Sequence, residues 1–550
     1  MAIIKLLISL TKGKVVRGVI MDKTILENMP RILETCTGCG YCYLLCPQNA
    51  IQTVTGSKYQ IVSEHCIICE KCVFACPVDA IEHPLLFHTE RQDLCCIQNK
   101  ANMKKDSYDV IIIGSGIGGL LTAASLSQRG KKIVVLERLN FFGGRFANIN
   151  YQGTCVNTGA YHIIPHGENG PFAEMIRSLN LPVNIHNSEG VGSLNINGKQ
   201  YRWKNIMGFL APFSFVEKID LLKIIVKILT IGESPCTASF EDWLKRQSSS
   251  EMIMNFFDRM INFGCSSSIN LLTYDKVREI VKNVYRHGFS GVPEGGCGNI
   301  VDKLVKQIID RDGDILTVTE VTELLIDNGS VTGVKASDRK NGNSLSLKAK
   351  TVISDIGPKE TLKLLKDENG IDCKEKAEII TNTMTKATIK ANANTNKDRV
   401  DIMETSGLCI RFLSDAPLRF PSGIMLCLDT ARVAGIVQPT NIDPGLAPEG
   451  KHLLISYQML KDSDVEKELD LGLADLVSIF GESFNKHCRV LGTSVFKNGW
   501  PVNRAVQGYD YPCLTSVRGL YLVGDGCKTS GYVMVEGIAK QVANVLSQIN

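Results

Sequence analysis

The stretch that decides the fold runs from Tyr108 to Glu137 and reads YDVIIIGSGIGGLLTAASLSQRGKKIVVLE. An apolar run, a glycine turn, a helical segment and a second apolar run predict a strand, a helix and a parallel strand. Gly114 permits the tight turn, Gly116 lets the backbone approach a pyrophosphate at the helix N-terminus, and Gly119 allows close packing of helix on strand. Glu137 ends the second strand, where a carboxylate can bind ribose hydroxyls. The pattern predicts a dinucleotide-binding fold.

A second motif lies upstream, in residues 31–94. TCTGCGYCYLLCPQNAI at 35–51 is echoed by HCIICEKCVFACPVDAI at 65–81, and each half has the spacing C-x2-C-x2-C-x3-C-P. Three thiolates of each loop can converge on one [4Fe–4S] cluster, while the fourth points toward the other cluster. A zinc site uses paired C-x2-C without the third and fourth cysteines, and free structural cysteines would not repeat this spacing. The segment resembles a bacterial two-cluster ferredoxin. The expected ligand sets are Cys36, Cys39, Cys42 and Cys76 for one cluster, and Cys66, Cys69, Cys72 and Cys46 for the second.

The composition is that of an ordinary globular protein. Of 550 residues, 44% are hydrophobic and 21% are charged, so the chain can bury a large core. The 61 basic and 57 acidic residues nearly balance, and no basic, aromatic-interleaved stretch indicates nucleic-acid binding. No apolar run is long enough to span a membrane. The 20 cysteines without an export signal indicate a cytoplasmic protein.

The chain divides into several expected parts. Residues 1–30 form a basic amphipathic segment, which predicts either peripheral contact with the inner face of a membrane or a docking or frayed terminus. The iron–sulfur part covers 31–94 and a polar linker covers 95–107, with no assigned role for Cys95 and Cys96. Residues 108–185, 285–360 and 495–550 are expected to form the dinucleotide-binding domain, and 186–284 and 361–494 a substrate domain. Asn-Gly pairs at 197–198 and 328–329 predict hairpin turns.

Three further features resemble flavoproteins of the glutathione-reductase superfamily and imply that the dinucleotide is FAD. Gly143-Gly144-Arg145 follows the ribose-binding acid, as in that superfamily. LYLVGDG at 520–526 resembles its second flavin motif, in which Gly524 and Asp525 would approach the ribityl chain. Val321 matches the position whose backbone meets adenine.

The resemblance extends to the phytoene desaturase family over nearly all of 108–550. The stretches that carry it are GGRFANINYQG, TGAYHIIPHG, VPEGGCGNIVDKL, ISDIGPKET, TNIDPGLAPEGKHLL, GWPVNRAVQG and the tail GYVMVEGIAKQVA, which contains Val535. This family includes carotenoid desaturases and isomerases and retinol saturase-like reductases. The chain departs from bacterial desaturases at GDGCKTSGYVMVEG, which replaces a glycine/proline-rich run and leaves the substrate open. The implied fold is α/β: a glutathione-reductase-type FAD-binding Rossmann domain, a mixed α+β substrate domain and a small ferredoxin-like 2[4Fe–4S] domain.

The resemblance implies hydride and proton exchange at a carbon–carbon bond of an apolar, isoprenoid-like small molecule. His162 and His166 are candidates for the acid or base, or else are packing residues. Tyr532 and Glu536 are candidates to line the flavin ring. No second G-x-G-x-x-G follows residue 145, so we expect electrons to be exchanged with an external ferredoxin through the clusters.

Two other functions stay open. The chain could be an electron-transfer subunit between ferredoxin and a partner protein, or an amine-oxidase-like enzyme, which shares the flavin fold. The apolar segment 205–231 predicts either a lid or membrane-dipping helix pair, or an amphipathic core helix.

Overall fold

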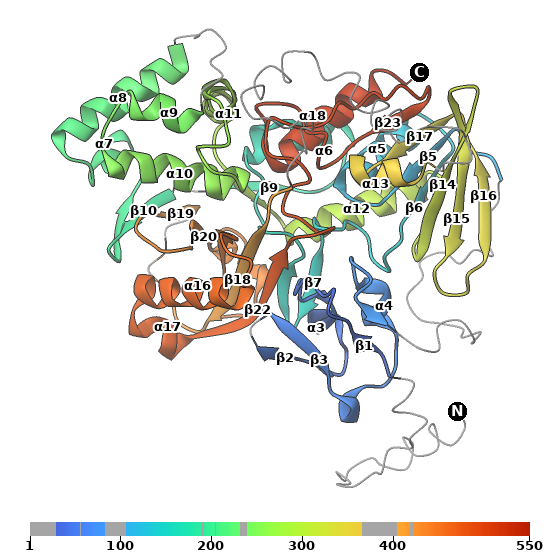
Figure 1. Ribbon diagram of the computed structural model, residues 1–550, viewed down its shortest axis with the longest axis horizontal. Helices are drawn as coiled ribbons and strands as arrows, with labels where there is room; N and C mark the ends of the chain where they lie inside the picture. Colours follow the sequence, from blue (N-terminus) through green and yellow to red (C-terminus); the bar gives the residue numbers. More distant parts are fainter. Residues whose placement is uncertain are drawn as a thin grey trace.

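The computed structural model describes residues 29–55, 57–82, 106–188, 192–203, 205–230, 239–365, 404–418, 420 and 423–549. Residues 1–28 of the expected N-terminal segment, Cys95, Cys96 and residues 95–105 of the expected linker lie outside these ranges. The described chain forms a small N-terminal part packed beneath two larger ones, each built around its own sheet (Figure 1).

The first large part is built on the glycine-turn stretch. Its five strands are parallel, in the order β13-β6-β5-β17-β23. Helices α5 and α12 pack together, and α18 packs on α5, while an antiparallel sheet of β14, β15 and β16 contributes to a separate apolar cluster. The α/β fold predicted from the sequence is confirmed. The bounds are β5 Val110–Ile113, α5 Ile117–Gln128, β6 Ile133–Leu136, α12 Gly296–Asp310, β13 Asp314–Leu316, β14 Thr319–Asp327, β15 Ser330–Asp338, β16 Ser344–Lys348, β17 Thr351–Ser354, α13 Pro358–Lys363, β23 Leu520–Leu522 and α18 Met534–Leu546.

The second large part is a seven-stranded sheet in the order β11-β10-β19-β20-β21-β18-β22. Helix α10 packs on β19 and β21, and α16 contributes to the apolar cluster on the other side of the sheet. Within the expected segment 205–231, residues 205–230 are described and contain the helix pair α7 and α8. The bounds are β10 Gly192–Ile196, β11 Lys199–Arg202, α7 Ile206–Leu210, α8 Phe215–Thr230, α9 Phe240–Lys245, α10 Glu251–Cys265, α11 Tyr274–His287, β18 Gly407–Ser414, β19 Ile424–Cys427, β20 Gly435–Val437, β21 His452–Met459, α16 Val465–Phe480, α17 Glu482–His487 and β22 Cys488–Phe496.

Short elements join the two large parts. Strand β9 pairs with β12, and β7 pairs with β8. Both Asn-Gly hairpins are confirmed, since β10 pairs with β11 around 197–198 and β14 with β15 around 328–329. The bounds are β7 Asn148–Tyr151, β8 Thr154–Asn157, α6 Pro171–Ser178, β9 Ile185–Asn187 and β12 Gly291–Pro293.

The N-terminal part carries both cysteine motifs on two short helices that contact each other, α3 and α4. Strand β1 pairs with β4, and β2 with β3, so each half of the sequence repeat supplies a helix and edge strands. The bounds are β1 Arg31–Ile32, α3 Tyr41–Leu45, β2 Ile51–Thr55, β3 Lys58–Ile61, α4 Lys71–Ala75 and β4 Ile81–Glu82. We call residues 31–82 the cluster domain.

Tyr41 fastens the cluster domain to the rest of the chain. Its side chain is fully buried, its hydroxyl donates to the carbonyl of Thr158, and Trp500 Nε1 donates to that hydroxyl at 3.1 Å. The Tyr41 and Trp500 rings also meet edge to face, with centroids 5.8 Å apart. Because Thr158 and Trp500 belong to the large parts, one side chain holds three segments together.

We predict that Tyr41→Phe lowers the free energy of unfolding by about 1–3 kcal/mol, because it leaves a buried carbonyl and an indole N–H without a partner. Tyr43→Phe is the matched control, since Tyr43 is only half-buried and its hydroxyl pairs with another hydroxyl, that of Tyr151, at 2.9 Å. Anaerobic urea unfolding of the holoprotein, followed by visible absorbance, measures both. Equal losses in the two variants would contradict the role given to Tyr41.

Candidate functional site

A long cleft of about 960 Å³ runs between all three parts of the molecule. Its walls include the glycine turn, the end of β6, the start of β14 and the segment around Asp525. Of the residues predicted to bind the cofactor, these line it: Gly114, Gly116, Glu137, Gly143, Gly144, Arg145, Val321, Asp525 and Val535. Gly119 and Gly524 lie directly behind this lining.

The glycine turn is closed by backbone packing that only glycine permits. A Cβ on Gly119 would lie 2.3 Å from the carbonyl oxygen of Gly114, so the helix could not approach the strand as it does. Gly144 has a φ of +55°, a conformation that favours glycine, and it lines the cleft beside the turn. The turn therefore presents bare backbone at the N-terminus of α5, where phosphate groups bind well.

Glu137 is held in place at the end of β6. Its carboxylate accepts hydrogen bonds from the Ser115 amide at 2.8 Å, the Ser115 hydroxyl at 2.7 Å and the Leu139 amide at 2.8 Å. These bonds fix the carboxylate at the cleft wall, between the glycine turn and β14, where the ribose of a dinucleotide is expected.

A buried network of charges occupies the other end of the cleft. Asp525 accepts hydrogen bonds from Arg145 at 2.6 Å and from Lys528 at 2.6 Å, and Lys528 also lies 3.0 Å from Asp510. Burial alone would raise the pKa of Asp525, but Lys528 and Arg145 hold it below its usual range. Burial alone would lower the pKa of Lys528, but the two carboxylates hold it above its usual range. Lys528 is therefore a fixed cation.

Sequence reasoning missed Lys528 and Asp355. Lys528 lies in GDGCKTSGYVMVEG, the stretch that departs from bacterial desaturases, and this departure was the available signal. Asp355 follows β17 and accepts a hydrogen bond from the Gly119 amide at 2.8 Å. Burial raises the pKa of Asp355 to about 8. A carboxyl at this place is tolerated beside a phosphate when it is protonated.

The two predicted acid–base histidines do not line the cleft. His162 is fully buried and its Nε2 pairs with the Cys155 carbonyl at 2.8 Å. Burial lowers the pKa values of His162 and His166 to about 4, so both are neutral at neutral pH. Their catalytic role stays a prediction that this geometry does not favour.

Tyr532 and Glu536 also lie outside the lining. The Tyr532 ring contacts the ring of His166. Glu536 accepts hydrogen bonds from the backbone amides of His166 at 3.0 Å and Phe172 at 2.8 Å. Burial raises the pKa of Glu536 to about 7. Glu536 therefore ties the start of α18 to the start of α6.

The structure brings motif cysteines of the two halves close together. Cys39 and Cys42 lie near Cys36 and Cys76, and Cys42 also lies near Cys72. Cys66 and Cys72 lie near Cys46 and Cys69, and these four line a small cavity. The assignment of Cys36, Cys39, Cys42 and Cys76 to one [4Fe–4S] cluster and of Cys46, Cys66, Cys69 and Cys72 to the other stays a prediction with which these neighbours are compatible.

The cleft fits FAD. Val321 for the adenine, Glu137 for the ribose, the bare glycine turn for the pyrophosphate and Asp525 for the ribityl chain all line one continuous space. We propose these residues as the ones that hold the cofactor.

We predict that Gly119→Ala weakens FAD binding by roughly tenfold or more, because the new methyl group separates helix α5 from the glycine turn. Gly492→Ala is the control, since a Cβ there would make only ordinary contacts at 3.8 and 3.9 Å. Titration of the FAD-depleted protein with FAD, followed by flavin fluorescence, gives both dissociation constants. Unchanged binding by Gly119→Ala would show that the cofactor lies elsewhere.

Comparisons with known proteins agree with this geometry. Residues 117–540 match the family described as flavin containing amine oxidoreductase, and residues 31–83 match a 4Fe-4S dicluster domain. An uncharacterized protein of Methanocaldococcus jannaschii is 33% identical over 80% of this chain and 98% of its own. A chloroplastic prolycopene isomerase of Daucus carota is 23% identical over 76% of each chain.

A crystal structure of an oxidoreductase from Methanosarcina mazei superposes with a TM-score of 0.68. It is 32% identical and covers 80% of this chain and 99% of its own. The chain therefore belongs to the flavin-containing amine oxidoreductase family, carries an N-terminal 4Fe-4S dicluster domain, and has FAD and two [4Fe–4S] clusters as its cofactors.

Proposed function

We propose that the protein adds or removes hydrogen at carbon–carbon bonds of an apolar, isoprenoid- or carotenoid-like molecule, and that it exchanges electrons with an external ferredoxin through its two clusters. When bound, FAD supplies hydride exchange with carbon and the clusters supply single electrons. The observation that carries this proposal is the joint lining of one cleft. Apolar side chains such as Tyr161 and Ile163 form part of its wall, and Thr35, Thr37, Pro77 and Val78 of the cluster domain form another part.

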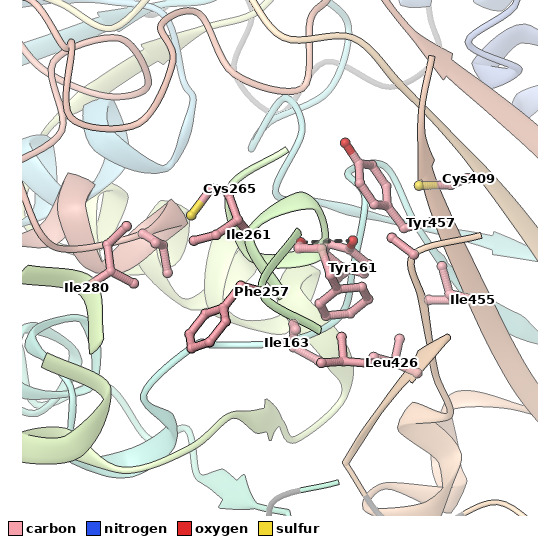
Figure 2. Close-up of a cluster of buried hydrophobic side chains, with 14 of the residues drawn as sticks. Tyr161, Ile163, Phe257, Ile261, Cys265, Ile280, Cys409, Leu426, Ile455 and Tyr457 are labelled. Carbon is pink, nitrogen blue, oxygen red and sulfur yellow. Dashed lines mark hydrogen bonds between the residues drawn. The ribbon is translucent and has the colours of Figure 1, made fainter. Parts of the chain in front are cut away.

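Tyr161 and Ile163 belong to a cluster of buried apolar side chains between the seven-stranded sheet and helix α10 (Figure 2). Tyr161 forms part of the cleft wall. Its ring packs against the rings of Phe263 and Tyr457, with centroid separations of 4.7 Å and 5.3 Å. Ile163 lines the cleft beside it, and Phe257 and Leu426 belong to the same buried cluster. A surface of this kind binds long apolar molecules by excluding water from them.

The charges around Lys528 disfavour an amine substrate. An aromatic pair can bind a cation, but Lys528 lines the same cleft and is held protonated. Its carboxylate neighbours Asp525 and Asp510 already pair with it. A cationic amine beside Lys528 would therefore meet a fixed positive charge whose carboxylate neighbours are already paired.

Lys528 and Arg145 also favour the reduction of a group that is bound in the cleft. Both cations pair with Asp525 and line the cleft. Fixed cations at the wall of the cleft stabilise a group that gains negative charge when it is reduced.

An electron-transfer subunit is the second candidate. The docked cluster domain favours it, because a relay needs clusters beside a flavin. A relay has no need of the large sheet and helices that enclose the apolar end, so we rank it below the enzyme.

We predict that chemically reduced holoprotein, incubated anaerobically with polyprenyl lipids and carotenoids, changes the mass of at least one of them by two hydrogens. Mass spectrometry measures the change, and FAD-depleted Gly119→Ala protein is the control. Peroxide release from amines in air, with no mass change in any isoprenoid, would contradict the proposal.

We also propose that α7 and α8 contact the surface of an anionic membrane, from which an apolar substrate would enter. Met207 and Phe215 are 74% and 78% exposed, and Val216, Ile219, Leu222 and Val226 are exposed beside them. Glu217 and Asp220 are engaged by hydrogen bonds from Ser250 and Ser248, while Lys223 is exposed. This combination is typical of an interfacial helix. No helix in the described part of the chain is long and apolar enough to span a bilayer.

We predict that the protein floats with vesicles containing phosphatidylserine, and that the double variant Phe215→Asp/Val216→Asp greatly reduces flotation, because it removes apolar area and adds repulsion. Val477→Asp, at an exposed position on α16, is the control. Equal flotation of the double variant and the control would place the membrane contact outside this helix pair.

A further inference from the structure

The two thiolate groups of the cluster domain have different surroundings. In the first group, Cys39, Cys42 and Cys76 are only 6–7% exposed. Its loop contacts the large parts, since the Cys39 carbonyl accepts a hydrogen bond from the Ser494 hydroxyl at 2.6 Å. In the second group, Cys69 is exposed and the other three cysteines are half-buried. One set of thiolates therefore faces the interior of the molecule and the other faces its outside.

The sequences of the two ligand loops agree with one loop facing the interior and the other facing outward. Gly38 and Gly40 of the first loop have φ angles of +78° and +79°, and their counterparts Ile68 and Glu70 have φ angles of +51° and +61°. A Cβ on Gly40 would lie 2.7 Å from the carbonyl oxygen of Thr493. The first loop therefore needs glycine both for its conformation and for close approach to β22. The second loop keeps bulky side chains in a conformation that such residues rarely adopt.

The outer loop forms a compact surface. Ile67 is 58% exposed, and His65, Cys69 and Lys71 are exposed around it. A small apolar centre with a polar rim suits the weak, transient complexes of redox proteins, which bury less than about 1,200 Å². The exposed Cys69 and its half-buried neighbours beside this centre suit a partner that exchanges electrons, because the rate of electron transfer falls steeply with distance.

We propose that the loop 65–71 is the docking surface for a small one-electron carrier protein, and that the loop 36–42 faces the flavin cleft. This inference rests on the proposed function and assigns its electron partner to one surface. Reduction of one carbon–carbon double bond to a single bond consumes two electrons and two protons. Two reduced carriers would therefore dock in turn, and each would give up one electron. The protons come from water. For desaturation, two oxidised carriers would each accept one electron, and the two protons would be released.

The test uses the full-length holoprotein with FAD and both clusters, and a reduced bacterial two-cluster ferredoxin as the probe. Ile67→Glu replaces the apolar centre with a charge, and Val477→Glu on α16 is the matched exposed control. We expect Ile67→Glu to weaken ferredoxin binding by roughly tenfold or more. We also expect it to slow reduction of the clusters by ferredoxin in anaerobic stopped-flow absorbance. Reduction by dithionite and the cluster electron paramagnetic resonance spectrum should be unchanged, as should both properties of Val477→Glu.

Ferredoxin binding and reduction at wild-type values in Ile67→Glu would overturn the docking assignment. So would self-association of the holoprotein that Ile67→Glu abolishes, because the surface would then bind a second copy. Failure of the proposed function has a different signature: dithionite-reduced holoprotein would leave every isoprenoid unchanged, whatever the outcome of the ferredoxin measurements.

Discussion

The rest of the account depends on the buried hydroxyl of Tyr41. It joins the cluster domain to Thr158 on one side and Trp500 on the other, and so holds the inner thiolate set against the cleft wall. A second connection runs through the buried Arg411, which donates to the Ser494 hydroxyl at 2.7 Å, while that hydroxyl donates to the Cys39 carbonyl. Without these bonds the cluster domain would be joined to the large parts by the polypeptide chain alone. With these bonds it is fixed against the cleft and forms part of the same site.

The attachment of the cluster domain explains why the three parts belong to one chain. The clusters carry single electrons, and the bond chemistry of the family's flavin needs two. A fixed cluster domain at one wall of the cleft and apolar side chains at another bring both needs to one place. Lys528 and Arg145, held by Asp525, line the same cleft. In the described part of the chain, the outer loop of the cluster domain stays exposed.

Much of this could be predicted from the sequence, because the signals are local. The cysteine spacing and the stretch 108–137 each contain all the residues that their loops require. The two Asn-Gly hairpins were equally local. Lys528 could not be predicted, since its meaning depends on Asp510, Asp525 and Arg145, which the fold alone brings together. The role of His162 also depends on the fold: its place in a family motif suggests chemistry, but the structure buries its imidazole against the Cys155 carbonyl.

An anaerobic reductive titration shows whether the clusters and the flavin form one electron-transfer unit. The purified protein, assayed for iron and FAD, is titrated with reduced ferredoxin and followed by visible absorbance and electron paramagnetic resonance. The account predicts about eight iron atoms and one FAD per chain, with clusters and flavin reduced together by ferredoxin and not by NADH or NADPH. Clusters that bleach while the flavin stays oxidised, or a flavin reduced rapidly by a nicotinamide, would contradict it.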